Sequence, residues 1–136
     1  MNIKEKEQEI KDNFAFLEDL DQKYEYVIEL GKKLPALDAS YKKDEFRIKG
    51  CQSTVWLVPE FKNGQIYFNA DSDSVFVKGL VSLLIYVASG QVPGEVMHLD
   101  TSYIHDIGLG NYLSPTRSNG LLAMVAQMRA YASANN

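Results

Sequence analysis

Residues 54–69 read TVWLVPEFKNGQIYFN, the clearest β-hairpin pattern in the chain. Two runs rich in β-branched and aromatic residues flank Asn63-Gly64, a dipeptide that accepts the positive φ angles of a type I′ turn. Pro59 has no N–H to donate to a ladder, so its strand is expected at a sheet edge or with a bulge. The expected cross-strand pairs, all placed on the core face, are Phe61 with Ile66, Pro59 with Phe68, and Leu57 with Ala70.

Helical patterns lie on both sides of this hairpin. Apolar residues recur at helical spacing in several segments, and short polar residues or prolines stand where helices begin. The expected helices are 3–17, a second from Asp19 or Asp21 to the region of Gly31 and Pro35, a third from a cap at Asp71, Ser72 or Asp73 to Gly90, two short ones near 93–99 and 103–107, and a last one from Ser114-Pro115 to Met128. Helices, then a small antiparallel sheet, then helices predict an α+β fold in a single domain over residues 1–136.

The composition excludes several classes of protein. The chain has 136 residues, 46% of them hydrophobic and 24% charged, which is typical of a globular domain. The net charge of −4 disfavours non-specific nucleic-acid binding, which needs clustered cations. A single cysteine excludes an internal disulfide, a CxxC pair and a zinc site built on cysteines. With no apolar leader and no apolar run of about 20 residues, we expect a cytoplasmic protein without a membrane span.

The one cysteine, Cys51, stands in a context that favours chemistry over packing. A lone cysteine is commonly a small buried hydrophobe. Here Gly50 precedes it and Gln52, Ser53 and Thr54 follow it, the composition of an exposed turn that enters a strand. Arg47 and Lys49 lie just upstream, and nearby cations favour a thiolate, so the sequence predicts a lowered thiol pKa. A thiolate on a turn is the right nucleophile for attack on sulfur in a partner's cleft.

Other candidate groups are weaker. His98 and His105 are the only histidines, and their spacing matches no compact metal motif, so surface or packing roles are favoured. Asp71-Ser72-Asp73-Ser74 resembles the start of a calcium loop, but Phe76 stands where that loop needs glycine. These acids are therefore expected to cap a helix, and no metal site is predicted.

Four segments resemble the SufE family, the sulfur acceptors of cysteine desulfurases. GCQSTVW at 50–56 is similar to the family's GCQSxVW signature, and YEYVIELGKKLP at 24–35 is similar to its N-terminal helical segment. DSD at 71–73 with VKGL at 77–80 resembles its central block. LSPTR at 113–117, followed by Gly120, Leu121 and Met124, resembles its LSPSRxxGLxxM block, with Thr116 in place of the usual serine. Together they span about nine-tenths of the chain in the same order, which makes the resemblance specific.

The resemblance implies a fold and a reaction. The fold would be a compact α+β one, SufE/IscU-like, with Cys51 on a loop beside a small sheet. Cys51 would accept sulfur from the persulfide of a pyridoxal-phosphate-dependent, SufS-like cysteine desulfurase, stimulate that enzyme and pass the sulfur to a SufBCD-like iron–sulfur scaffold. The pyridoxal phosphate belongs to the partner, so no bound cofactor is expected here. A homodimer is left open.

The resemblance also assigns roles to residues. Cys51 is the acceptor nucleophile. Arg117 is expected near it, to lower the thiol pKa or to bind a carboxylate of the partner, with a structural contact as the alternative. Gln52 is expected to hydrogen-bond the loop or the partner. Trp56 is expected to pack into the core at the base of the loop, with partner anchoring as the alternative. Asp73 is expected to cap a helix. Because an exposed persulfide is lost to free thiols, we expect Cys51 to rest against apolar residues and to extend on docking.

The chain is expected to be an accessory in sulfur transfer rather than a stand-alone enzyme. Three other functions remain open from the residues alone. The protein could activate a desulfurase allosterically without carrying sulfur. A cysteine hydrolase or peroxidase would need His98 or His105 as a base, or a resolving thiol, near Cys51. An iron–sulfur scaffold with one thiolate per chain would need ligands from several chains.

Overall fold

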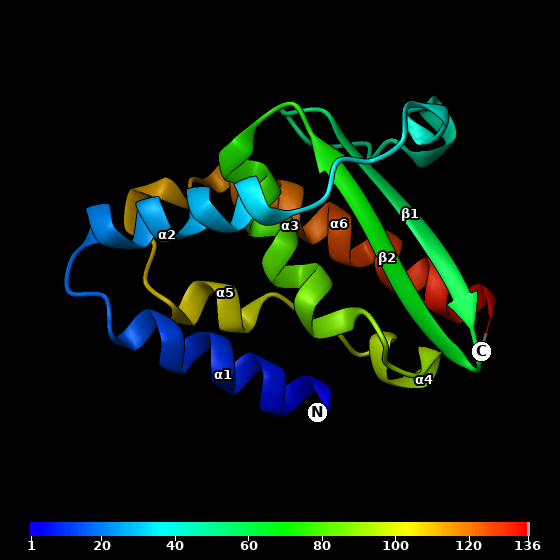
Figure 1. Cartoon of the computed structure of the whole chain (residues 1–136), viewed down its shortest axis with the longest axis horizontal. Coiled ribbons are helices and arrows are strands. Elements are labelled where there is room, and N and C mark those ends of the chain that lie inside the picture. Colours follow the sequence, from blue (N-terminus) through cyan, green and yellow to red (C-terminus); the bar gives the residue numbers. More distant parts are fainter. Residues whose placement is uncertain (136) are drawn as a thin grey trace.

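The computed structural model describes residues 1–135, and Asn136, the last residue of the domain expected from the sequence, lies outside the described residues. The described elements are α1 (Ile3–Ala15), α2 (Leu20–Lys33), β1 (Val55–Lys62), β2 (Gln65–Ser72), α3 (Val75–Ala88), α4 (Pro93–Val96), α5 (Ser102–Asp106) and α6 (Pro115–Ala134). Three short 3₁₀ turns lie at Ala39–Tyr41, Asp44–Phe46 and Gly110–Tyr112. The hairpin lies along one side of the helices (Figure 1). The α+β prediction is confirmed.

The hairpin has the register that the turn dipeptide predicts. Asn63 and Gly64 have φ angles of 54° and 76°, and β1 pairs with β2 antiparallel through each of the three expected pairs. Both strands are edges of a two-stranded sheet, so Pro59 is accommodated as expected. The prediction that every pair faces the core is wrong at the tip, where the side chain of Phe61 is 41% exposed. The turn end of the hairpin carries this side chain to the surface, while the core-facing residues Leu57, Ile66, Phe68 and Ala70 are buried.

Helix α3 forms the centre of the molecule. It contacts α1, α2, α6 and β2, and most of its side chains are buried, as expected for a helix that is apolar on nearly every face. Its cap is Ser74, whose hydroxyl accepts from the N–H of Val77, so the caps expected at 71–73 are wrong by one to three residues. The strand β2 runs to Ser72 and delays the start of the helix.

A close crossing holds α2 against α3. A side chain on Gly31 would strike the carbonyl oxygen of Val75, and one on Gly79 would strike the carbonyl oxygen of Val27. Helix α2 ends at Lys33, between Gly31 and Pro35, so the end region expected from the sequence is confirmed, and Gly31 itself lies in the last turn of the helix. Glycine here serves close backbone approach, which the helix accepts at a small cost in propensity.

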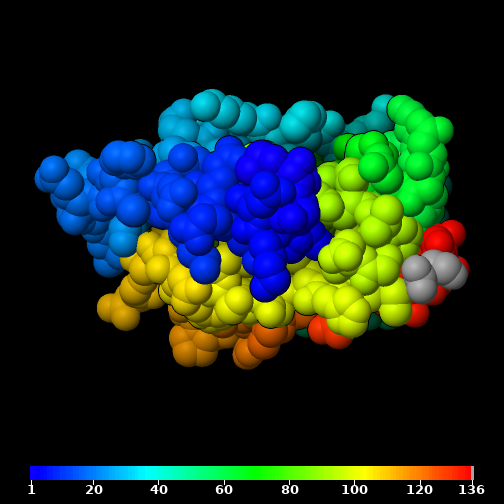
Figure 2. All heavy atoms as spheres, turned by 90° about the horizontal axis from the view of Figure 1, so that it is seen from below, coloured from blue at the N-terminus to red at the C-terminus, as the bar shows by residue number. Residues whose placement is uncertain are grey.

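The remaining helices close the core from the other side. Ser114 caps α6 and Pro115 is its first residue, both as predicted. Helix α6 contacts α3, α4 and β1, and α1 lies beside α5. Figure 2 shows α1 and the segment that holds α4 and α5 side by side on this face. This arrangement leaves the loop before β1 facing the first turns of α6, where the candidate site lies.

Candidate functional site

Cys51 lies on a loop that is hydrogen-bonded at both ends to other parts of the chain. Before it, the N–H of Ile48 donates to the carbonyl of Val55 at 2.8 Å. After it, the N–H of Thr54 donates to the carboxylate of Asp73 at 3.1 Å. Gly50 has a φ of 93°, a left-handed conformation that suits glycine and turns the chain toward Cys51. The loop is thus short and hydrogen-bonded at both ends, and only residues 49–53 lie between the two attachments.

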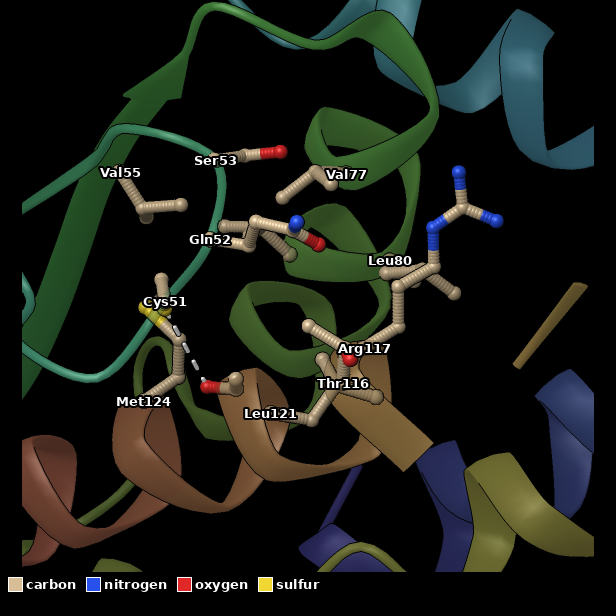
Figure 3. Close-up of a pocket in the computed structure, with 12 residues that line it drawn as sticks. Cys51, Gln52, Ser53, Val55, Val77, Leu80, Thr116, Arg117, Leu121 and Met124 are labelled. Atoms are coloured by element: carbon tan, nitrogen blue, oxygen red, sulfur yellow. Dashed lines mark hydrogen bonds between the residues drawn. The ribbon is translucent and has the colours of Figure 1, made fainter. Parts of the chain in front are cut away.

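Cys51 rests against helix α6 with its thiol half-buried. The S–H donates to the carbonyl oxygen of Gly120, with 3.6 Å between sulfur and oxygen (Figure 3). A Cβ on Gly120 would lie 3.4 Å from this sulfur, so the absence of a side chain at 120 makes room for the thiol. The sequence placed Gly120 in one block of the resemblance but gave it no role, because its contact with Cys51 joins residues 69 positions apart.

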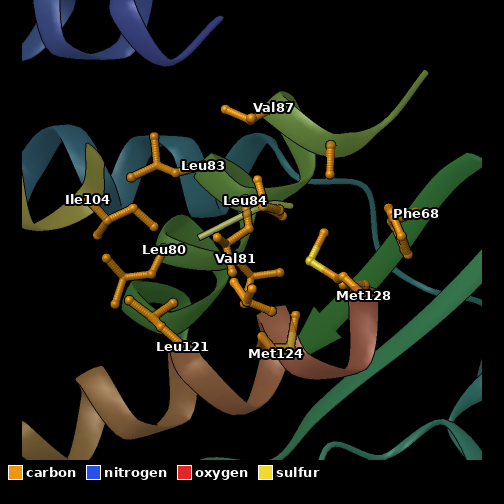
Figure 4. Close-up of a cluster of buried hydrophobic side chains, with 14 of the residues drawn as sticks. Phe68, Leu80, Val81, Leu83, Leu84, Val87, Ile104, Leu121, Met124 and Met128 are labelled. Atoms are coloured by element: carbon orange, nitrogen blue, oxygen red, sulfur yellow. The ribbon is translucent and has the colours of Figure 1, made fainter. Parts of the chain in front are cut away.

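A small cavity opens beside the thiol. Its volume is about 100 Å³. Its lining residues are Cys51, Gln52, Ser53, Val55, Val77, Leu80, Val81, Thr116, Arg117, Gly120, Leu121 and Met124. The apolar part of this wall belongs to the same buried cluster that fills the protein's interior (Figure 4). The structure agrees with the expectation that the cysteine shelters against apolar residues.

The environment of Cys51 raises the pKa of its thiol. Burial is the cause, because removal from water disfavours the charged thiolate. The prediction of a lowered pKa from Arg47 and Lys49 is therefore wrong for this resting arrangement. Both cations border an open hollow of about 640 Å³ that Cys51 also lines, and the carboxylates of Asp44 and Glu45 share that hollow with them. The resting loop keeps the sulfur protonated.

Arg117 lines the cavity, but its guanidinium group points away from Cys51 (Figure 3). Its guanidinium donates to the carbonyl oxygen of Tyr112 at 2.9 Å and lies 4.6 Å from the centre of the Phe76 ring. Figure 3 shows the guanidinium directed away from Cys51. The structural contact that the sequence left as the alternative is present, and in this arrangement the guanidinium does not lower the thiol pKa.

The other supporting residues lie around the loop. Gln52 is exposed at the mouth of the cavity. Asp73 caps no helix; its carboxylate instead holds the N–H of Thr54, which corrects the sequence-based role. Trp56 lies outside the buried core, so the expectation of core packing is wrong. Its indole is partly exposed, and the ammonium of Lys42 lies 5.4 Å from the ring centre.

No acid–base partner for the thiol lines the cavity in the part of the chain that the structure describes. His98 and His105 are exposed residues of the segment around α4 and α5, and neither borders either hollow beside Cys51. Within residues 1–135 there is also no group of three or more metal-ligating side chains. The site thus consists of one thiol, an apolar wall behind it and a loop that is hydrogen-bonded at both ends.

A family model described as "SufE: Fe-S metabolism associated domain" matches residues 8–132. The chain belongs to the SufE family. The resemblance found in the sequence is thereby confirmed, and with it an association with Fe–S metabolism.

Two relatives extend this result for the SufE-family chain. An uncharacterised SufE-like protein of Rhizobium etli is 42% identical over 126 residues, which cover 89% of this chain and 85% of that protein. A second, from Rhizobium meliloti, is 36% identical over 129 residues, which cover 91% and 92% of the two chains. In both cases the match extends over most of the domain rather than over one motif.

A solved structure supports the fold of this SufE-family chain. The solution structure of a hypothetical protein from Thermus thermophilus superposes with a TM-score of 0.78 at 19% identity and covers 95% of this chain and 94% of the other. At that identity the likeness concerns the fold alone. Among residues 1–135, no helix combines the length and the apolar character needed to cross a membrane.

Sequence reasoning missed the roles of two residues of this SufE-family chain, one at the site and one in the core. Gly120, which seats the thiol, had no local signal. Asp71 was read as a helix cap, whereas its carboxylate is buried and binds two lysines. A buried carboxylate needs cations, but Lys42 lies in a separate segment well before Asp71, and only the folded chain shows that Lys42 and Lys78 meet this acid.

Proposed function

We propose that this protein is a sulfur acceptor and carrier that takes persulfide sulfur from a cysteine desulfurase onto Cys51. The donor is a pyridoxal-phosphate-dependent, SufS-like enzyme that the carrier stimulates, and the receiver is a SufBCD-like iron–sulfur scaffold in the cytoplasm. The observation that carries the proposal is the seat of Cys51, a lone thiol on a tied loop over a small apolar cavity. The family's association with Fe–S metabolism supports it.

The reaction follows from thiol chemistry. When the loop leaves α6, the thiol loses its bond to the Gly120 carbonyl and returns to water, where deprotonation costs less. The Cys51 thiolate then attacks the outer sulfur of the donor's persulfide. A new S–S bond forms on Cys51, the donor's S–S bond breaks, and the donor's cysteine leaves as a thiolate that takes up the released proton. The sulfur keeps its oxidation state, so no oxidant is needed.

The apolar cavity suits storage of the cargo. A persulfide that faces solvent meets free thiols, which remove the outer sulfur. Return of the loop to α6 places the sulfur beside Val55, Leu80 and Met124, away from such thiols. The same return raises the cost of ionisation, so the stored group is least reactive between the two docking events.

A second candidate function shares the docking step but not the transfer. In it the protein binds and activates a desulfurase without carrying sulfur. The partly exposed Trp56 beside the loop supports it equally, because an anchor serves either role. The two functions differ in whether Cys51 itself gains sulfur.

One incubation separates them. The protein is mixed with a SufS-like desulfurase and L-cysteine without added reductant, and its intact mass is measured. Because Cys51 is the only cysteine, an added sulfur atom is assigned to it without digestion. We expect the wild type to gain sulfur and Cys51→Ser to gain none, to keep its fold and to lose stimulation. A Cys51→Ser protein that stimulates fully at saturating concentration would overturn the carrier function and support the activator.

A further inference from the structure

Asp71 is the one charged side chain in the buried core of residues 1–135. Its carboxylate accepts from the backbone N–H of Leu37 at 3.1 Å and of Ser72 at 2.8 Å. Two ammonium groups complete its surroundings, those of Lys78 at 3.2 Å and Lys42 at 3.4 Å. A buried ion pair adds little net stability compared with apolar packing, because removing the charges from water costs free energy. Stability alone therefore does not explain why a charged residue occupies this position.

The second lysine connects Asp71 to an aromatic ring. Trp56 lies directly across the hairpin from Asp71 in the strand register. Lys42 reaches from the segment before the loop, and its ammonium contacts both the carboxylate of Asp71 and the face of the indole, 5.4 Å from the ring centre. The ring is thereby held between its own strand and a cation whose position is fixed by a buried charge.

The location of this ring points to an interface. Trp56 is two residues beyond Thr54, where the Cys51 loop is tied, and it is not part of the core cluster. A protein that meets Cys51 covers about 800 Å² around it in an interface of ordinary size, which includes neighbours as close as Trp56. Tryptophan is enriched among residues that dominate binding energy, and an anchor held in its bound orientation loses less entropy on docking.

We propose that Asp71 is a positioning residue that acts through Lys42, holding the indole of Trp56 as a preorganised anchor for the sulfur donor. The docking face is the surface formed by Trp56 and Lys42 beside the Cys51 loop. Its occupant is the desulfurase, because Trp56 follows closely after the attached end of the loop whose cysteine must reach the donor's persulfide. The inference rests on the proposed function and names the surface that the same partner contacts.

The test uses Trp56 as its own probe, since it is the only tryptophan of the chain. Lys42→Met removes the cation, and Lys43→Met is the matched control, because Lys43 loses the same charge but makes no ion pair or ring contact within residues 1–135. We expect Lys42→Met to shift the indole emission and to raise the half-saturating concentration for desulfurase stimulation about three- to tenfold, with maximal stimulation unchanged. Lys43→Met should leave both quantities unchanged.

Asp71→Asn adds a second arm. If Asp71 acts through Lys42, this variant shifts the emission as Lys42→Met does, and the double variant binds the desulfurase no more weakly than Asp71→Asn alone. Unfolding of Asp71→Asn would leave the Lys42→Met comparison to decide. A Lys42→Met protein that binds as tightly as Lys43→Met, or whose emission is unchanged, would overturn the inference.

The outcomes are separable from those of the proposed function. If wild-type Cys51 gains no sulfur while Lys42→Met still weakens desulfurase binding, the carrier function fails and the docking face stands. If Cys51 gains sulfur and Lys42→Met binds and accepts sulfur as the wild type does, the carrier function stands and the positioning role of Asp71 fails.

Discussion

In the resting protein, the surroundings of Cys51 oppose the ionisation of the thiol that the proposed reaction needs. Burial raises the pKa of the thiol, and the S–H donates to a carbonyl oxygen, which favours the protonated form. In a carrier with this arrangement, the thiol is unreactive while no partner is bound. It becomes nucleophilic only when its loop leaves α6. Reactivity is then tied to the presence of a partner.

The alkylation rate of Cys51 measures this effect. Because the folded state raises the thiol pKa, the seat stabilises the neutral thiol at low pH and loses that contribution as pH rises through the folded pKa. We expect the rate with iodoacetamide to rise with pH along a curve whose midpoint lies above that of the same chain in denaturant. Each unit of displacement slows alkylation near neutral pH about tenfold. A folded midpoint at or below the unfolded one would contradict the prediction.

The position of the reactive residue could be predicted from the sequence, but its electrostatics could not. Gly50 through Trp56 carry the signature locally, so Cys51 is found without a structure. The direction of the pKa shift depends on burial of the thiol, which arises where Cys51 packs against Gly120, a residue distant in sequence. The neighbouring cations in the sequence suggested the opposite direction, because the sequence does not show how far the fold removes the thiol from water.

At the scale of elements, the Cys51 loop depends on the segment that joins β2 to α3. Asp73 accepts from the N–H of Thr54, and the N–H of Asp73 donates back to the Thr54 carbonyl at 3.3 Å. This pair closes the base of the loop, so the segment between strand and helix sets how readily the cysteine can swing out.

Asp73→Ala should loosen the loop. Loss of the acceptor removes a hydrogen bond worth about 1 kcal/mol, so we expect faster hydrogen exchange at the Thr54 amide and about fivefold faster alkylation of Cys51. Asp73→Asn keeps an oxygen at the same place and should have a smaller effect. Alkylation rates that are equal in Asp73→Ala and the wild type would show that the base of the loop does not govern the release of Cys51.

Elements with local signals were predicted best. Asn63-Gly64 fixes both the turn and the register, and Ser114-Pro115 fixes the start of α6. The start of α3 was missed because four successive residues at 71–74 can all cap a helix, and the choice depends on where β2 ends. Asp73 is the clearest example, since its carboxylate is taken by a residue 19 positions earlier.

At the scale of the whole molecule, one buried charge joins four segments. Asp71 holds the backbone at Leu37, the side chain of Lys42, the end of β2 and the first turn of α3. Burial alone would raise the pKa of this carboxyl. The N–H groups of Leu37 and Ser72 and the ammonium of Lys78 outweigh burial and hold the pKa below its usual value.

The unfolding free energy should therefore depend on acid through Asp71. A carboxyl whose folded pKa is lowered contributes stability above its unfolded pKa and loses it as pH falls through the folded value. We expect Asp71→Asn to lower the unfolding free energy by about 3 kcal/mol at neutral pH, since it leaves two ammonium groups without a counter-charge. Urea unfolding at neutral and acid pH measures this.

The difference between wild type and Asp71→Asn should shrink as the pH is lowered, because the wild type then carries a neutral carboxyl too. Asp44→Asn, which changes an exposed carboxylate in the same region, is the matched control. A difference that stays constant across the pH range would mean that the charge of Asp71 does not stabilise the fold. The α+β fold itself was predictable from the order of local patterns, whereas the burial of Asp71 required the packing of segments that are separate in sequence.

The cavity beside Cys51 is small and partly open to solvent, so we expect its volume to limit what the cysteine can carry while it rests there. About 100 Å³ accommodates one more sulfur atom, since a water-sized group occupies about 30 Å³, but not a tripeptide such as glutathione. A Cys51 side chain that carries glutathione would not fit into the cavity and would stay exposed to solvent, where reductants can reach and remove the glutathione. The protein would thus separate its proper load from oxidative damage by bulk alone, with no residue dedicated to telling the two apart.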